Sequence, residues 1–157
     1  IPEWIIRHNR DKFLPLEKKF NNNTKVFLDR SSSKYNHCQI KNINEVKDFF
    51  KKKGFTIYNP EKLGFQEQIY LFNQATIVAG AHGAAFTNIV FCEPSAKIIE
   101  IIPKSHPSKK CERISKILKL NYFRIETIDN NLNKNFPNNI FLTEKNLKKI
   151  AEITDLY

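Results

Sequence analysis

Short apolar segments alternate with amphipathic segments along most of the chain. The apolar runs are rich in β-branched residues, as in strands buried on both faces, and the segments between them repeat apolar residues at helical spacing. The expected strands span residues 25–29, 55–58, 76–80, 96–102 and 122–127, with a short edge strand at 140–142. Strands that alternate with helices predict an α/β, Rossmann-like fold with a mostly parallel sheet and helices on both faces.

The boundaries of several expected helices are marked by individual residues. Asn42 followed by Glu45 resembles a capping box with Asn in place of Ser or Thr, and Gly54 suits the end of the same helix. A short helix is expected to begin near Gly83. The apolar faces we expect the helices to bury are Val46, Phe49 and Phe50; Phe65, Ile69 and Phe72; Cys111, Ile114, Ile117 and Leu118; and Leu147, Ile150 and Ala151.

The length of 157 residues suits one domain with its own core. We assign residues 1–20 to an N-terminal helix and connector, and residues 21–157 to the α/β domain. The chain begins with Ile1 rather than Met, so we expect it to be part of a longer protein. No apolar run reaches the roughly 18 residues of a transmembrane helix, and the start lacks the pattern of a signal peptide.

The segment from residue 78 to residue 88 is the strongest candidate for chemistry. In a parallel sheet, ligands bind at the carboxyl ends of the strands, which directs attention to the loops after the first, third and fourth strands. Here a strand runs into a turn of small residues that include Gly80, Gly83 and Ala84, which let a ligand approach the backbone. The helix that follows exposes unpaired N–H groups and a favourable dipole, so a diphosphate fits this turn.

Three side chains of this segment are candidate ligands for a diphosphate. His82 lies at the mouth of the turn and could donate to a phosphate oxygen, and Thr87 and Asn88, one turn further on, could add hydrogen bonds. The alternative is a tight strand–helix corner around a buried histidine that is satisfied within the protein.

Four further polar residues have both a binding and a structural interpretation. Arg30 directly follows the first strand and is either a bidentate phosphate ligand or a surface residue. Glu67 and Gln68 begin the helix before the third strand. Either they hold Arg30 or the ribose of a ligand, or Glu67 simply interacts favourably with the helix dipole. Glu100 interrupts an apolar strand, so it is either a buried carboxylate with a partner or a solvated residue at a strand end.

The net charge of +10 is compatible with a nucleic acid, an anionic membrane or a phosphorylated small molecule as partner. The lysines are spread over the expected helices without interleaved aromatic residues, so we interpret them as solvated faces and do not expect nucleic-acid binding. The sequence has no Walker motif and no Gly-x-Ser-x-Gly elbow.

Cysteine, histidine and acidic spacings give no indication of a metal. The three cysteines, Cys38, Cys92 and Cys111, match no zinc pattern and suggest a reducing compartment. The histidines at positions 8, 37 and 106 lack the spacing of a metal site, and no Asp-x-Asp pair occurs. We therefore expect neither a metal nor another cofactor.

Taken in order, these elements resemble glycosyltransferase family 61 between about Lys25 and Pro103. That family includes plant xylosyltransferases, vertebrate protein O-linked N-acetylglucosaminyltransferases and bacterial capsular-polysaccharide enzymes. The similarity rests on Asp29-Arg30, Ile40-Lys41-Asn42 with Glu45, Glu67-Gln68, the phrase from Ala75 to Asn88, Phe91, Pro94 and Ile99-Glu100.

The resemblance implies one half of a GT-B fold. Residues 21–157 would be the nucleotide-sugar-binding domain, usually for a UDP-linked donor, with an acceptor domain preceding Ile1. It also implies inverting transfer of the sugar to a glycan, a lipid-linked or a protein hydroxyl. The general base is not assigned by the sequence. The donor-binding residues that we expect are Arg30, Glu67, Gln68, Gly80, His82, Gly83, Ala84, Thr87, Asn88 and Glu100.

One departure from the family's pattern bears on activity. The family often has a second Arg before the Ile-x-Asn element, whereas this chain reads His37-Cys38-Gln39-Ile40, leaving His37 or Lys41 to replace it. The absent Arg favours an alternative function, a non-catalytic nucleotide-binding domain of a degenerate transferase. A basic nucleic-acid-binding module is a third interpretation, whose mark would be a steep salt dependence. A bacterial protein of this kind would lie in the cytoplasm or at the inner membrane face, and a eukaryotic one in the Golgi or ER lumen.

Overall fold

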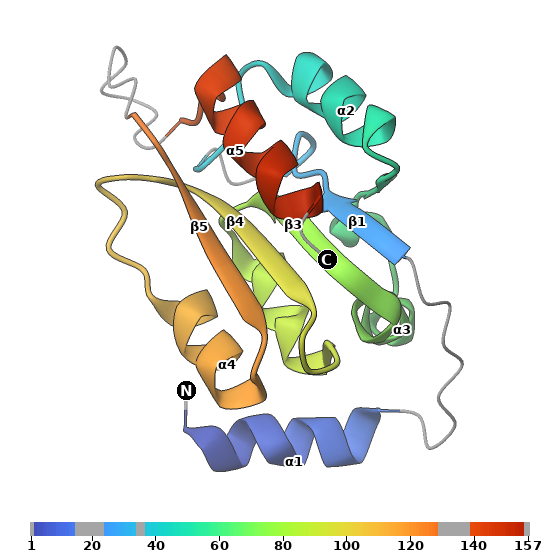
Figure 1. The fold of residues 1–157 in the computed structure, drawn as a ribbon. Coiled ribbons are helices and arrows are strands. Elements are labelled where there is room, and N and C mark those ends of the chain that lie inside the picture. Colours follow the sequence, from blue (N-terminus) through green and yellow to red (C-terminus); the bar gives the residue numbers. More distant parts are fainter. Residues whose placement is uncertain (1, 15–23, 34–36, 129–138, 156–157) are drawn as a thin grey trace.

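The computed structural model describes residues 2–14, 24–33, 37–128 and 139–155 (Figure 1). Within these residues, five parallel strands form one sheet in the order β2-β1-β3-β4-β5. The strands are β1 (Thr24–Leu28), β2 (Thr56–Tyr58), β3 (Ala75–Ala81), β4 (Lys97–Pro103) and β5 (Asn121–Thr127). The prediction of an α/β, Rossmann-like parallel sheet is therefore confirmed, with 76–80 in the central strand.

Helices cover both faces of the sheet (Figure 1). The α-helices are α1 (Glu3–Phe13), α2 (Ile43–Lys52), α3 (Phe65–Gln74), α4 (Lys110–Leu118) and α5 (Glu144–Asp155), and the 3-10 helices are η1 (Pro60–Lys62) and η2 (Ala84–Phe91). One face carries α2 and α5, and the other carries α3, η2 and α4. Helix α1 packs outside η2, where Arg10 donates to the carbonyl oxygens of Val90 and Cys92.

Each central strand supplies side chains to two cores. In β1, Val26 and Leu28 pack toward α3 and α4, whereas Phe27 packs toward α2 and α5. In β4, Ile98 and Ile99 divide in the same way. Because successive side chains of a strand point to opposite faces, a sheet covered on both sides needs apolar residues at every position, which explains the uninterrupted apolar runs.

The strand order reverses between β1 and β3. The chain leaves β1 for the edge strand β2 and returns to β3 on the other side of β1. As a result, α2 follows β1 on one face while η2 follows β3 on the opposite face. Connections that diverge in this way leave a crevice at the carboxyl ends of the two strands, which is where doubly wound sheets bind ligands.

Two local predictions are wrong. Residues 140–142 form no edge strand; Ile140 makes an isolated bridge to Ile40, and Leu142 is buried in the core on the side of α2 and α5. Asn42 does not cap α2 with its side chain, because its amide is bonded to the backbone N–H and carbonyl of Leu142 and to Glu45. The polar side chain therefore ties a distant segment to the start of α2.

Other expectations hold in part. Gly54, with φ of 79°, follows the end of α2 as expected. The helix after Gly83 is present, but as the 3-10 helix η2. On the expected apolar faces, Phe49, Ile117, Leu147 and Ala151 are only half-buried and Phe65 is exposed. The connector that we placed at residues 15–20 lies outside the described residues.

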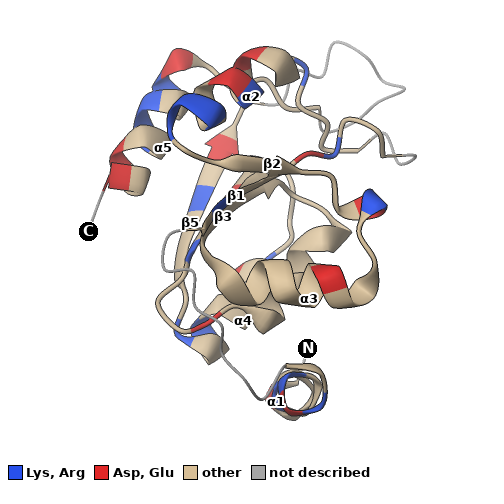
Figure 2. Cartoon of the chain, turned by 90° about the vertical axis from the view of Figure 1, so that its right-hand side faces the viewer, with Lys and Arg blue, Asp and Glu red and all other residues tan. Residues whose placement is uncertain are grey.

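Basic and acidic residues are mixed on the helices, as Figure 2 shows for α2 and α5. The lysines of α5 at positions 145, 148 and 149 are exposed, as are Lys51 and Lys52 of α2. None of the helices in the described ranges combines the length and apolar character needed to cross a bilayer.

Candidate functional site

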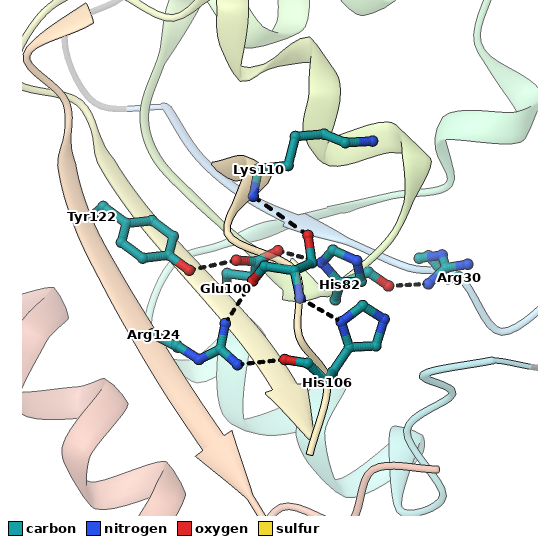
Figure 3. Close-up of polar contacts among 8 residues, drawn as sticks. Arg30, His82, Glu100, His106, Lys110, Tyr122 and Arg124 are labelled. Atoms are coloured by element: carbon teal, nitrogen blue, oxygen red, sulfur yellow. Dashed lines mark hydrogen bonds and ion pairs between the residues drawn. The ribbon is translucent and has the colours of Figure 1, made fainter. Parts of the chain in front are cut away.

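Arg30 lies two residues beyond β1 and reaches across the crevice to β3. Its Nη1 donates to the carbonyl oxygen of His82, and its guanidinium covers Gly83 (Figure 3). A Cβ on Gly83 would lie 2.5 Å from Nη1 and 2.7 Å from Nε of Arg30. The space above Gly83 is thus occupied by the protein's own cation, and the missing side chain allows Arg30 to lie against the turn. Burial lowers the pKa of Arg30, but an arginine remains charged at neutral pH.

Gly80 serves the sheet. It pairs with Leu28 and with Glu100, and a Cβ at this position would lie 3.0 Å from both the Cβ and the carbonyl oxygen of Leu28. This is tighter than nine in ten real Cβ contacts, so a side chain here would require β1 and β3 to shift apart by a few tenths of an ångström. Gly80 therefore sets the separation of the strands that carry Arg30 and His82.

Glu100 is buried and fully engaged, which decides between its two interpretations. Its side chain is 2% exposed, and Oε1 lies 2.5 Å from Nδ1 of His82 while Oε2 accepts from the hydroxyl of Tyr122 at 2.5 Å (Figure 3). The thiol of Cys111 also bonds to this carboxylate. Burial by itself raises the pKa of Glu100, but the hydrogen bonds from His82, Tyr122 and Cys111 outweigh it and hold the pKa below its usual value.

An ionised Glu100 orients His82. A carboxylate only accepts, so Nδ1 of His82 carries the proton that lies between the two groups. The opposite ring nitrogen, Nε2, has no hydrogen-bond partner among the described residues. The histidine is therefore anchored through Nδ1 by a partner within the protein, as in the structural interpretation of the sequence, while its role as a ligand for a diphosphate stays a prediction.

Two further histidines lie beside His82. The ring centroids of His106 and His37 lie 4.3 Å and 6.1 Å from that of His82, and 6.0 Å from each other. Each of these residues follows a different strand: His37 comes after β1, His82 after β3 and His106 after β4. The strand pattern predicts chemistry in these three loops, but the spacing of the histidines along the chain does not group His106 with His82. The crossover segments separate them in sequence, although the strand ends are adjacent in the sheet.

Arg124 fixes the loop that carries His106. From β5, its Nη2 donates to the carbonyl oxygen of His106 at 2.9 Å and its Nη1 to that of Ser108 at 3.0 Å (Figure 3). The backbone N–H of Ser108 in turn donates to Nδ1 of His106 at 3.3 Å. The position of the third imidazole is thus set by the neighbouring strand.

A hollow of about 350 Å³ opens beside Arg30. It is lined by Asp29, Arg30, Ser33, Pro60, Glu61, Gln68, Ala84, Ala85 and Asn88. Asn88 donates to Oε1 of Gln68 at 2.6 Å, and Gln68 donates to the carbonyl oxygens of Pro60 and Leu63. This network joins η2 to the start of α3 and brings Arg30, Gln68, Ala84 and Asn88 together.

Six of the ten expected donor-binding residues do not line this hollow: Gly80, His82, Gly83 and Glu100, whose places are given above, and Glu67 and Thr87. Glu67 is exposed and accepts from the backbone N–H of Gly64 at 2.7 Å at the start of its own helix, which agrees with the structural alternative that it serves that helix terminus. Thr87 is half-buried within η2 and does not line the hollow. The turn beside Arg30 therefore unites only part of the expected set.

Asp29 precedes Arg30 but does not neutralise it. Oδ2 of Asp29 lies 2.6 Å from Nζ of Lys47, and Oδ1 accepts from the N–H of Ser31. Burial raises the pKa of Asp29, but the bonds from Lys47 and Ser31 outweigh it and lower the pKa overall. Because Asp29 is paired with Lys47, the positive charge of Arg30 faces the crevice uncompensated by its neighbour.

One group of side chains among the described residues has the spacing of metal ligands. Donor atoms of His82, Glu100 and Cys111 lie within 4.8 Å of one another. Burial, followed by the nearby Glu100 carboxylate, raises the pKa of the Cys111 thiol strongly, so it stays protonated and donates to Glu100. A metal requires the thiolate, and this group therefore fits a hydrogen-bond network better than a metal site.

A larger hollow of about 740 Å³ lies between α1 and α3. Its lining is mostly apolar and includes Phe13, Tyr58, Leu63 and Tyr70. The one charged side chain among its lining residues is Glu67. This groove has no cation among its described lining residues, whereas the smaller hollow has Arg30 beside the acidic Asp29 and Glu61, so the smaller hollow is the better candidate for a phosphate ligand.

Comparison with known families agrees with the resemblance. The model of the family described as Glycosyltransferase 61 matches residues 4–99, which is more than half of the chain. The match includes Arg30, Gln68 and the turn at His82, and it ends one residue before Glu100. A search of the curated proteins found no match.

Proposed function

The chain belongs to glycosyltransferase family 61, and we propose that it binds the diphosphate of a UDP-linked sugar donor at the carboxyl ends of β1 and β3. The observation that carries the proposal is the contact of the Arg30 guanidinium with the backbone of His82 and Gly83, at the point where the strand order reverses. Arg30 brings a permanent cation and His82 a ring nitrogen that is open to a ligand.

The electrostatics of the crevice favour a dianion. Arg30 is half-buried, so a phosphate beside it would be screened less by water than at an exposed arginine. The start of η2 adds backbone N–H groups on the side of Ala84 and Ala85. A ligand seated there would reach Asn88 and Gln68 in the adjoining hollow, where hydrogen-bonding groups suit a ribose or uracil.

The same groups would assist transfer of the sugar. In an inverting displacement, the acceptor oxygen attacks the anomeric carbon and the bond from that carbon to the diphosphate oxygen breaks. The leaving UDP keeps the electron pair, while a general base removes the hydroxyl proton. Negative charge grows on the β-phosphate in the transition state, so a preorganised Arg30 and His82 lower the barrier.

We assign the acceptor and the base to a partner domain in a GT-B arrangement. The acceptor would be a glycan, a lipid-linked or a protein hydroxyl. Within the described residues, Arg30 and the imidazoles of His37, His82 and His106 lie at the carboxyl ends of the strands, where we place the leaving diphosphate. The proposal therefore gives this chain the donor half of the reaction, without a metal.

The alternative of a non-catalytic nucleotide-binding domain is favoured by the missing second Arg. His37 lies at that place with its ring 6.1 Å from that of His82, and both His37 and Lys41 are exposed. The imidazole of His37 therefore lies close to the place where other family members have the second Arg. This supports binding of the nucleotide-sugar donor in spite of the missing Arg. Donor binding without sugar transfer by the full-length protein would select the alternative.

Amide chemical-shift mapping with UDP tests the location of the site. We expect the largest changes at Arg30, Ser31 and residues 82–88, with small changes on α1 and α5. Changes centred on Phe13, Tyr58 and Tyr70 would place UDP in the larger apolar groove and contradict the proposal. An absence of any change at millimolar UDP would contradict donor binding itself.

A further inference from the structure

We propose that His37 and His106, which lie beside His82, bind the terminal phosphate of the nucleotide in protonated form, so that UDP binding is coupled to uptake of a proton from solvent. The inference rests on the proposed function and deepens it. It adds two ligand-binding residues and a pH dependence to the site of Arg30 and His82.

The geometry brings three imidazoles to one place from three loops. Their ring centroids are separated by 4.3, 6.0 and 6.1 Å, and the loops follow β1, β3 and β4, which are neighbours in the sheet. His82 lies at the β3 position, beside the guanidinium of Arg30. An anion at the open nitrogen of His82 therefore lies near the ring of His106, which Figure 3 draws beside it, and near that of His37.

Hydrogen bonds within the protein engage one ring nitrogen of His106 and one of His82. In His106, Nδ1 accepts from the N–H of Ser108, so the neutral ring carries its proton on Nε2. In His82, the bond to Glu100 places the proton on Nδ1. His106 is thus a hydrogen-bond donor at Nε2 already when neutral, whereas Nε2 of the neutral His82 ring carries a lone pair.

The same tautomer argues against a metal among the imidazoles. A metal binds a ring nitrogen through its lone pair, and Nδ1 of His106 already uses that lone pair for Ser108. An Nε2–H group suits a phosphate oxygen instead. The cluster is therefore better matched to an anion than to a cation.

The surroundings of His37 and His106 disfavour their protonated forms without a ligand. His37 faces Arg30 and His82, and His106 faces His82, His37, Arg124 and Glu100. The carboxylate among these groups, Glu100, already accepts from His82, Tyr122 and Cys111. Burial, and after it the nearby positive groups, lower the pKa values of His37 and His106 below 6.5.

A bound diphosphate shifts the pKa values of His37 and His106 in the opposite direction. Negative charge near the rings favours the imidazolium form and raises the pKa values of His37 and His106. Between the lowered pKa of the free protein and the raised pKa of the complex, binding adds a proton to an imidazole. The affinity for UDP therefore rises as the pH falls through that window, in proportion to the protons taken up.

Isothermal titration calorimetry with UDP at pH 7.5, in two buffers of different ionisation enthalpy, counts the protons. At that pH a terminal phosphate with a second pKa near 6 is already deprotonated, so its own titration contributes little. We expect the wild-type chain to take up roughly 0.5–1 proton per UDP, and its affinity to rise about two- to tenfold from pH 8.5 to pH 7.5. EDTA in all samples excludes transition metals.

Variants assign the proton to the cluster. His37→Gln and His106→Gln should each lower the uptake, and the double variant should reduce it to less than about one-third of the wild-type value. His8→Gln, on the exposed surface of α1, is the matched control and should behave as wild type. His82 is left unchanged because its bond to buried Glu100 also supports the fold.

The outcomes separate this inference from the proposed function. UDP binding without proton uptake, or with uptake that persists in the double variant, would overturn the inference and leave the donor site standing. Failure of the wild-type chain to bind UDP would overturn both.

Discussion

The guanidinium of Arg30 lies against the backbone of Gly83, so that a Cβ on Gly83 would come within 2.5 Å of Arg30 Nη1. The two residues follow different strands, β1 and β3, and meet at the crevice where the strand order reverses. Gly83 has φ of 172°, an extended conformation that any residue can adopt. What the glycine contributes is therefore its lack of a side chain and not its backbone freedom. The glycine makes room for the cation that we assign to the diphosphate.

Gly83→Ala should therefore weaken UDP binding with little loss of stability. The atoms that a Cβ would meet belong to the flexible end of Arg30, which can swing away at small cost. We expect affinity to fall about tenfold, equivalent to about 1.4 kcal/mol. Calorimetric titration measures the affinity for UDP, and a thermal melt measures the stability. A variant with unchanged affinity would mean that the position of Arg30 over the turn is irrelevant to binding.

Gly80→Ala is predicted to show the opposite behaviour. Its Cβ would meet the backbone and Cβ of Leu28 at 3.0 Å, and these atoms cannot swing aside. Overpacking between β1 and β3 should cost about 1–3 kcal/mol of the free energy of unfolding. Denaturant unfolding measures it, and a variant as stable as wild type would show that the sheet relaxes easily at this point.

Glu100 should contribute a pH-dependent part of the stability. Its pKa is lowered in the folded chain, so its contribution is present above the unfolded value near 4.5 and is lost as the pH falls through the folded value. Glu100→Gln should be less stable than wild type at pH 7, because a neutral amide accepts more weakly from His82 and Tyr122.

The difference in unfolding free energy between wild type and Glu100→Gln should shrink from pH 6 to pH 3. Asp29 contributes in the same direction in both proteins and cancels in this comparison. Urea unfolding across this range measures the difference. A difference that stays constant with pH would mean that the carboxylate charge adds nothing to the network.

The sequence predicted those features that depend on local pattern. Uninterrupted apolar runs identified the strands of a doubly covered sheet, and the small residues after β3 identified the turn at His82. The 3-10 form of η2 was missed, because apolar spacing over eight residues does not distinguish 3-10 from α-helix.

Features that depend on distant partners were not predictable in the same way. Asn42 looks like a helix cap by its neighbours in sequence, yet its side chain bonds to Leu142, 100 residues away. Glu67 and Gln68 are adjacent, but the helix directs Glu67 to its own start and Gln68 to Asn88. The position of His106 beside His82 follows from the sheet order, which strand patterns alone do not specify.

The most direct test of donor binding at this crevice is a calorimetric titration of UDP into three proteins: wild type, Arg30→Ala and Arg7→Ala. Arg7 is an exposed arginine of α1, paired only with Glu3 among the described residues, and so controls for loss of one positive charge. A charge-assisted hydrogen bond contributes about 1.5–3 kcal/mol, so Arg30→Ala should bind UDP at least about tenfold more weakly. Arg7→Ala should bind as wild type does. Equal affinities for Arg30→Ala and Arg7→Ala, with both proteins folded by thermal melt, would contradict a diphosphate site at Arg30.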